Sequence, residues 1–391
     1  MTKILEGIRV IELGTMITAP LAGMMLADLG ADVVKVERPD GGDPFRSFRG
    51  GLYSPHFVAF NRNKRSVTLD LQTDDGKAAL RRLLSGADVL LENFRQGVMD
   101  RLGFDAAEMR RSFPRLVWCS ITGFGAGGPY ADRPAYDAVA GALSGLASIM
   151  VDPETPQASG PTISDNVTGM YAAYGILGAL YERERTGKGR RVEVNMLEAA
   201  ISFIPDTFSN FTRLGIESGP LTRVASSQSY AFRCKDGALL AIHLSSPDKF
   251  WKKLTEVIER PELAEDERFS KRDARVRNYL DLQHELAAAF VRKDRAHWEA
   301  RLQRADVPFA PVQTISEVMH DPQVKHLQTF YDLSHPVEGA VNGINSPLYF
   351  DGSRCVDMRP PPTLGEHNED PDFTTLETTR ALWPVDDRSD R

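Results

Sequence analysis

The chain has 391 residues, of which 42% are hydrophobic and 26% are charged, and its formal net charge is -7. This length is enough for two or three domains with a sizeable buried core. The negative balance argues against a general nucleic-acid-binding protein, because such proteins are usually basic.

The first half of the chain alternates strand and helix patterns. The opening strand, helix and strand form a βαβ unit, which implies a parallel sheet with right-handed crossovers. We therefore predict a doubly wound α/β domain. The predicted strands are residues 8–13, 32–37, 65–71, 88–92, 116–122 and 191–195, and the predicted helices are residues 20–29, 75–85, 106–112, 134–150 and 165–185.

The character of the sequence changes after about Ser218. Residues 230–234 and 238–243 flank the turn sequence Lys-Asp-Gly, which is typical of a β-hairpin. Charged amphipathic helices are predicted after it, at residues 248–258, 279–291 and 295–304. This part predicts a smaller α+β domain.

The cysteines and the N-terminal sequence bear on where in the cell the protein is expected. Cys119, Cys234 and Cys355 are widely spaced and give neither a zinc pattern nor a disulfide framework, which favours a reducing environment and no metal site. The N-terminus enters a strand pattern directly, and no apolar run is long enough to cross a bilayer. We expect a cytoplasmic protein with no membrane partner.

A glycine-rich motif follows the strand at residues 116–122. Residues 123–128 read GFGAGG and match G-x-G-x-x-G. A dinucleotide site also needs a helix that opens at the glycines and an acidic residue about twenty positions later, and neither is present. The turn after the first strand lacks the fingerprint as well. We expect no NAD site and interpret the glycines, Gly125 among them, as a mobile loop or a backbone wall for a ligand.

Several cations follow strands or lie in turns between elements. Ligands of open α/β sheets bind outside the carboxyl ends of the strands, so cations there can bind phosphate. A single surface arginine is usually only solvated, but the segments 61–65 and 92–95 combine cations, amides and an aromatic residue, which suits a nucleotide. The cations are Arg38, Arg62, Lys64, Arg65, Arg95 and Arg101.

Asp165 is the strongest candidate for chemistry. It precedes a run rich in glycine and alanine that predicts a helix, so its first interpretation is a helix N-cap. Glycines cost helix stability, however, and their number suggests that something approaches this helix closely. The histidines show no catalytic or metal spacing, and no serine lies in a G-x-S-x-G elbow.

Several stretches spread along the chain carry a family resemblance. They are, in order, LEGIRVIEL, ADLGADVVKVERPDGGD, NRNKRSVTLDL, ADVLLENFRQGVMDRLGF, CSITGFGAGGPYADRPAYDAVAGALSG, SDNVTGMYAAYGILGAL, RTGKGRRVEVNMLEA and LGEH. Together they resemble the family III CoA-transferases, which include formyl-CoA transferase and L-carnitine CoA-transferase. The resemblance covers nearly the whole chain. It implies an α/β fold with a Rossmann-like large domain at residues 1–217 and 326–391, and an inserted small α+β domain at residues 218–325. It also implies ring-shaped subunits that form an interlocked homodimer.

The resemblance further implies a reaction. CoA would move from an acyl-CoA donor to a carboxylic acid through an anhydride and then a thioester of Asp165. Acyl-CoA and acids would be substrates, with no tightly bound cofactor. By the same match, Arg38, Asn93, Phe94, Arg101, Leu102 and Lys64 would bind CoA, while Ile17, Tyr136, Gly125 and Gln228 would form the active-site wall.

Two departures from the family pattern bear on the substrate. Ile17 stands where the best-known member has a glutamine, and residues 225–228 (ASSQ) stand in place of a glycine-rich active-site loop. Both favour a larger dicarboxylic or hydroxy acid over formyl and oxalyl substrates. Two rival functions remain: a 2-methylacyl-CoA racemase, whose catalytic histidine falls at Tyr136 here, and a non-catalytic acyl-CoA-binding protein.

Overall fold

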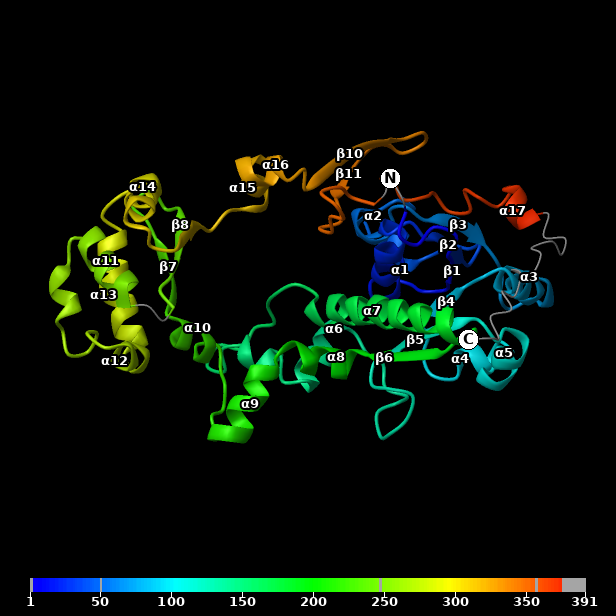
Figure 1. Ribbon diagram of the computed structural model, residues 1–391, viewed down its shortest axis with the longest axis horizontal. Helices are drawn as coiled ribbons and strands as arrows, with labels where there is room; N and C mark the ends of the chain where they lie inside the picture. Colours follow the sequence, from blue (N-terminus) through cyan, green and yellow to red (C-terminus); the bar gives the residue numbers. More distant parts are fainter. Residues whose placement is uncertain (1–2, 50, 246–247, 356–357, 375–391) are drawn as a thin grey trace, which may run out of the picture. The chain divides into compact units, whose positions relative to one another are not determined.

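The structure is a computed structural model that describes residues 3–49, 51–245, 248–355 and 358–374. The chain divides into two compact units, each described by itself (Figure 1). Unit 1 contains Met1–Ser144, Gly160–Ile204 and Gln328–Arg391, and unit 2 contains Gly145–Ser159 and Pro205–Leu327.

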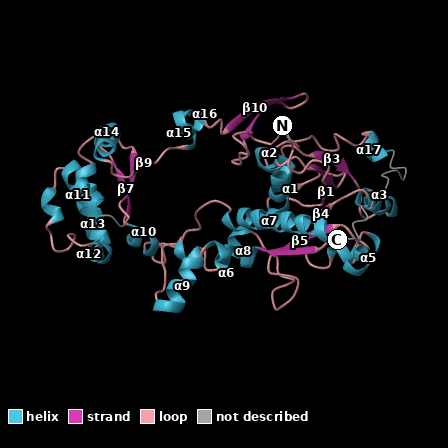
Figure 2. Cartoon of the chain, in the orientation of Figure 1, coloured by secondary structure: helices cyan, strands magenta, loops and turns pink. Residues whose placement is uncertain are grey.

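A six-stranded parallel sheet forms the centre of unit 1, in the order β3-β2-β1-β4-β5-β6 (Figure 1), and strands are drawn in magenta in Figure 2. The strand order reverses between β1 and β4, and in doubly wound folds ligands bind in the crevice outside the carboxyl ends of the strands at such a point. The predicted α/β sheet is confirmed. Its strands are β1 (Arg9–Glu12), β2 (Asp32–Glu37), β3 (Arg65–Thr68), β4 (Val89–Glu92), β5 (Val117–Thr122) and β6 (Arg191–Asn195).

Helices cover both faces of this sheet. One core cluster joins α1 and α7 to β1, β4 and β5 through residues such as Ala22, Val117 and Ile176. A second cluster joins α3, α4 and α5 to the opposite face through residues such as Leu80, Met109 and Trp118. The unit 1 helices are α1 (Thr18–Asp28), α2 (Pro55–Phe60), α3 (Asp74–Ser85), α4 (Val98–Arg101), α5 (Ala106–Ser112), α6 (Asp137–Leu143), α7 (Ile163–Thr186), α8 (Met196–Phe203) and α17 (Pro371–Thr374).

Helix starts follow from capping side chains. Thr73 accepts the N–H of Gly76 at the start of α3, and Asp105 accepts two N–H groups at the start of α5. The helix predicted over residues 134–150 is wrong in length: α6 ends at Leu143, and only a short 3-10 turn, Ala147–Ile149, follows. Gly145 adopts a left-handed φ of 84°, which interrupts the helix.

The C-terminal part of the described chain returns to unit 1 and covers the open edge of β3. The N–H of His367 donates to the carbonyl of Ser66 at 3.0 Å, and the N–H of Thr68 donates to the side chain of Asn368 at 2.8 Å. An antiparallel hairpin, β10 (Phe330–His335) and β11 (Gly339–Ile344), precedes this segment. Sequence periodicity did not predict that hairpin.

Unit 2 is an α+β unit with its own core. The predicted hairpin is confirmed as β7 (Ser229–Arg233) and β8 (Leu239–His243), and β9 (Phe309–Pro311) adds a third strand. In its core, Phe232 stacks on Phe290, and Trp298 packs against Phe290 at a tilt. The unit 2 helices are α9 (Pro205–Leu214), α10 (Thr222–Ser227), α11 (Asp248–Val257), α12 (Arg272–Arg277), α13 (Tyr279–Phe290), α14 (Arg295–Ala305), α15 (Ile315–His320) and α16 (Pro322–His326). Within the described ranges, no helix of either unit is long and apolar enough to span a membrane.

Candidate active site

The turn between β1 and α1 lies at the crevice where the strand order reverses. Met16 has a left-handed φ of 64°, an uncommon conformation for a residue with a side chain. Its N–H donates to the carboxylate of Asp43 at 3.1 Å. Asn93, just after β4, accepts the N–H of Thr15 at 2.9 Å and donates to the carbonyl of Thr15 and to the hydroxyl of Thr18. The amide of Asn93 therefore holds the turn, and the turn is fixed from both sides.

A buried charge network supports the same turn. The ammonium of Lys35 lies 3.0 Å from Glu12, 2.9 Å from Asp43 and 2.7 Å from the carbonyl of Gly14. Burial disfavours the charged form of Lys35, but the carboxylates of Asp43 and Glu12 raise its pKa. All three side chains are almost completely shielded from solvent.

Lys64 belongs to this network. Its ammonium donates to Glu12, to the carbonyl of Pro20 and to the side chain of Asn61, and its side chain has no exposed surface. Burial lowers the pKa of Lys64 to about 8, although the carboxylate of Glu12 favours the charged form and acts in the opposite direction. The ammonium is occupied inside unit 1, so we leave Lys64 out of the CoA-binding residues proposed below.

Asp165 lies in the first turn of α7 but does not cap it. The helix begins at Ile163 after Thr162, so Asp165 is its third residue, and the cap interpretation is wrong. Within the described ranges, no donor forms a hydrogen bond to its carboxylate. One turn later, a Cβ at Gly169 would lie 2.8 Å from the carbonyl of Thr18. The glycine lets α7 contact the start of α1 closely, one turn after Asp165.

A second carboxylate lies next to Asp165. The side chain of Asp137, the first residue of α6, accepts the backbone N–H of Asp165 at 3.1 Å. Burial, together with the negative charge of Asp137, raises the pKa of Asp165 to about 7. Asp137 directly follows Tyr136 in the sequence, but sequence reasoning named only the tyrosine as a site residue.

Ser164 was also missed by sequence reasoning. It precedes Asp165, its side chain is completely buried, and its hydroxyl has no hydrogen-bond partner in the described part of the chain. A buried, unpaired hydroxyl is costly and uncommon in folded proteins. No sequence signal separates this serine from an ordinary first-turn residue.

The glycine-rich loop follows β5 at the same edge of the sheet. Gly125 has a left-handed φ of 94°, and its N–H donates to the hydroxyl of Thr122. No helix opens at the glycines, because the next one begins at Asp137. Tyr136 directly precedes that helix, and its side chain is 61% exposed. Ile17, in contrast, is buried against Phe45 and Phe57.

The predicted cations separate into two groups. Arg62 and Arg65 pair with Asp28 and Asp32 inside unit 1, as Lys64 pairs with Glu12. Arg38 follows β2 and donates only to the carbonyl of Gly42, while Arg101 ends α4; both are exposed, and neither has an ion pair among the described residues. Phe94 and Leu102 are half-buried against the second core cluster.

Gln228 lies in unit 2. The stretch expected as an active-site loop is the end of α10, and Gln228 follows it with a left-handed φ of 51°. Its side chain has no exposed surface, accepts a hydrogen bond from Arg275 at 2.6 Å and donates to the carbonyl of Ser245.

The sheet order is that of a doubly wound α/β protein, and the carboxylate of Asp165, which accepts no hydrogen bond from the described residues, marks the candidate active site. The model of CoA-transferase family III matches residues 5–368. Succinate–glutarate CoA-transferase of Agrobacterium fabrum is 32% identical over 377 residues, which cover 93% of each chain. Formyl-CoA:oxalate CoA-transferase of Streptomyces avermitilis is 35% identical over 394 residues, which cover 94% of each chain.

A solved structure agrees with these relatives. The crystal structure of a CAIB/BAIF family protein from Brucella suis aligns with a TM-score of 0.83 and 32% identity, covering 94% of this chain and 98% of that chain. The chain belongs to CoA-transferase family III, as its motifs predicted, and it is an enzyme that transfers CoA.

Proposed function

We propose that Asp165 carries the acyl group while CoA moves from an acyl-CoA donor to a carboxylic acid. The observation that supports this most is the position of its carboxylate, which is half-buried in the first turn of α7 and accepts no hydrogen bond from any described residue. A nucleophile must present a free oxygen to the substrate.

The steps exchange one activated acyl group for another. An oxygen of Asp165 attacks the thioester carbon, the C–S bond breaks, and a mixed anhydride and CoA thiolate result. The thiolate attacks the Asp165 carbonyl, which gives an aspartyl-CoA thioester and releases the donor acid. The acceptor carboxylate then attacks this thioester, and the released thiolate attacks the acceptor carbonyl. Acceptor-CoA leaves, and the Asp165 carboxylate is restored.

Donors for the developing negative charge are available at the start of α7. The N–H of Ser164 has no acceptor among the described residues, and its hydroxyl is also unpaired. Donors at a helix start stabilise an oxyanion. We assign this role to Ser164, which has no exposed surface in the free chain, so the first turn of α7 must shift when the substrate binds. Ser164→Ala should lower turnover without changing CoA affinity, and unchanged turnover would remove the hydroxyl from the site.

Burial of Asp165, together with the negative charge of Asp137, sets the pH range in which the reaction runs. Ordinary aspartates are ionised at neutral pH, but the pKa of Asp165 is about 7, so its ionised fraction and the turnover should fall about tenfold per pH unit below that value. Asp137→Asn keeps a side-chain oxygen for the N–H of Asp165 and removes the charge. We expect the acid limb of the pH–rate profile to move to lower pH in this variant. An unmoved limb would assign it to another group.

Arg38 and Arg101 are proposed to bind the CoA phosphates, with Phe94 and Leu102 beside them. Arg38 directly follows β2, and Arg101 lies in α4, the helix that follows β4; β2 and β4 are the two neighbours of β1 in the sheet, and ligands of such sheets bind outside the carboxyl ends of the strands. Arg38→Ala and Arg101→Ala should each weaken CoA binding by about 1.5–3 kcal/mol, as a lost charge-assisted hydrogen bond does. Calorimetry measures this. The exposed Arg82 of α3 offers a matched control, because Arg82→Ala should leave affinity unchanged.

The racemase alternative is tested by exchange of the α-proton. A racemase needs two bases, and Tyr136, in place of a histidine, is a poor second base at neutral pH. Incubation with a 2-methylacyl-CoA in D₂O should therefore give no deuterium at the α-carbon. Rapid uptake that disappears in Asp165→Ala would replace the transferase proposal, and CoA binding without any turnover on a panel of acids would favour a binding protein.

We further propose a larger dicarboxylic or hydroxy acid as acceptor. The relative from Agrobacterium fabrum, named for succinate and glutarate, supports this choice. The proposed acceptor class is tested by comparing the rates of CoA transfer to glutarate, to a 2-hydroxy acid and to oxalate. A higher rate with oxalate would contradict it.

The interlocked homodimer and the domain boundaries at residues 217/218 and 325/326 remain proposals. Exposed apolar side chains on one helix support an interface, because such patches mark protein contacts. They are Met170, Tyr171, Tyr174 and Tyr181 of α7. Light scattering that gives the mass of one chain would contradict the dimer.

A further inference from the structure

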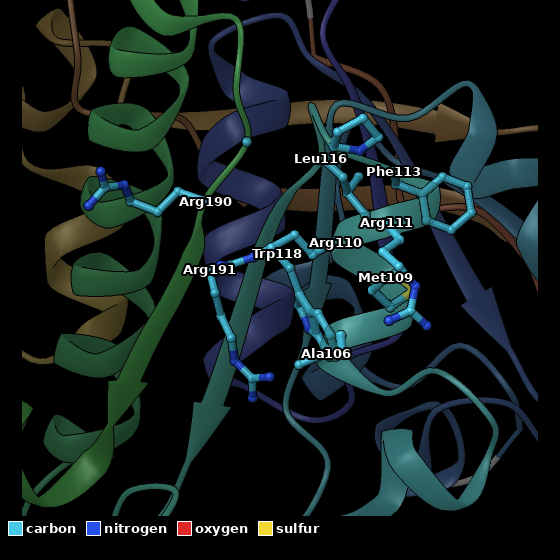
Figure 3. A pocket seen from close by; sticks show the side chains of 12 residues that line it. Ala106, Met109, Arg110, Arg111, Phe113, Leu116, Trp118, Arg190 and Arg191 are labelled. Atoms are coloured by element: carbon cyan, nitrogen blue, oxygen red, sulfur yellow. The ribbon is translucent and has the colours of Figure 1, made fainter.

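A hollow of about 400 Å³ lies at the amino ends of β5 and β6, beside α5 (Figure 3). We call it the β5–β6 pocket. Its floor is apolar and includes Phe113, Leu116 and Trp118, and arginines from two segments stand around it. The arginines are Arg110 and Arg111 at the end of α5, and Arg190 and Arg191 at the start of β6.

The charges around this pocket are only partly neutralised. Arg190 pairs with Glu182, and Arg191 lies 3.0 Å from Glu193. Arg110 and Arg111, in contrast, form no ion pair or side-chain hydrogen bond with any described residue. The side chain of Arg190 points away from the pocket toward α7, so the guanidinium groups of Arg110, Arg111 and Arg191 remain beside it in a protein whose net charge is -7 (Figure 3). The local field therefore attracts anions although the whole protein repels them.

The guanidinium of Arg191 lies over the indole ring of Trp118, 4.5 Å from the ring centre. Its Nε is shielded from solvent and lies 3.0 Å from the carboxylate of Glu193. Arg191 is therefore held at the apolar floor by Trp118 and Glu193, and Arg110 and Arg111 are the cations with which a ligand would pair.

This pocket is separate from the candidate active site. Asp165 lies at the carboxyl edge of the sheet, while the β5–β6 pocket lies where β5 and β6 begin. The two sites also lie on opposite faces, since α7 packs with Val117 and Cys119, and Trp118 belongs to the opposite core cluster. No residue of the candidate active site lines the pocket.

We propose that the β5–β6 pocket binds a small organic acid, that is, an apolar body that carries a carboxylate. The apolar floor suits an aryl or short alkyl group, and the volume is at the lower end of the range for ligand sites. The planar guanidinium groups suit a carboxylate, which accepts two parallel N–H bonds. This proposal does not depend on the reaction assigned to Asp165.

The test uses the full chain labelled with 5-fluorotryptophan and follows the ¹⁹F resonance of Trp118, assigned with Trp118→Phe. The probe is 4-phenylbutyrate, and its neutral control is 4-phenylbutyramide. We expect the acid to shift the Trp118 resonance and to bind at least about tenfold more tightly than the amide. Equal affinities, or no shift up to about 10 mM acid, would overturn the proposal.

Variants locate the binding. Arg110→Gln combined with Arg111→Gln should lower the affinity for 4-phenylbutyrate at least about tenfold. Both positions are exposed, so the double variant should fold as wild type does. Arg82→Gln, on exposed α3 surface, should bind as wild type. Asp165→Asn should also bind as wild type, because the active site is not involved. Unchanged affinity in the double variant, or a loss in Asp165→Asn, would contradict the proposed location.

Discussion

Asp165→Asn should fold and bind CoA normally, yet lose at least about a thousandfold of its turnover. The amide keeps the size of the side chain but has no carboxylate oxygen to attack a thioester. Steady-state rates with purified protein measure the loss, and calorimetry with CoA provides the control. A variant that keeps near wild-type turnover would remove Asp165 from the reaction.

The same residue should be found in a covalent adduct. Wild-type enzyme incubated with donor alone should accumulate acyl or CoA on Asp165, and hydroxylamine should trap it, since both anhydrides and thioesters react with this reagent. Peptide mapping should place the label on the peptide that contains Ser164-Asp165-Asn166. A label on another peptide would contradict the mechanism even if the variant is inactive.

The substitution should also stabilise the protein at high pH. The pKa of Asp165 is about 7 in the folded chain and 3.8 in a model carboxyl, so the unfolded chain holds fewer protons between these values. Wild-type stability therefore falls as pH rises from about 4 to 7. We expect the Asn variant to melt at a higher temperature than wild type at pH 8, and the difference to shrink toward pH 4. A constant difference would contradict the raised pKa.

Lys35→Met should destabilise unit 1 by about 3–5 kcal/mol, because it leaves Glu12 and Asp43 buried with less compensation. Hydrogen exchange of the β1 and β2 amides measures the loss in the relevant unit. A matched control is Arg301→Met, which breaks an ion pair with the largely exposed Glu259 and should cost less than about 1 kcal/mol. Similar protection in Lys35→Met and wild type would show that the network adds little.

Regular elements of unit 1 were largely predictable because burial imposes a clear period on them. Strands such as β2 and β6 have the predicted bounds, and so does the helix α5. The β10–β11 hairpin lacks this signal, since its side chains alternate weakly between buried and exposed positions.

The candidate site was predictable only in part, because local sequence does not show which charges meet inside the fold. Lys64 and Arg38 look alike as cations after a turn, yet one is completely buried beside Glu12 and the other is exposed. Asp137 and Asp165 are 28 positions apart, and only the packing of α6 against α7 brings them together. For Asp165 the local sequence favoured a helix cap, and its catalytic role was predicted from the resemblance to the CoA-transferases.

The cover on the edge of β3 has a consequence for synthesis on the ribosome. Ser66 and its partner His367 are 301 positions apart in the chain. At about 5–20 residues per second, translation needs roughly 15–60 s to deliver that partner after β3 has emerged. During this interval the strand edge is open to pairing with other nascent chains. When elongation is slow, or when the chain stops before His367, we therefore expect the protein to aggregate rather than to form a soluble enzyme of lower activity.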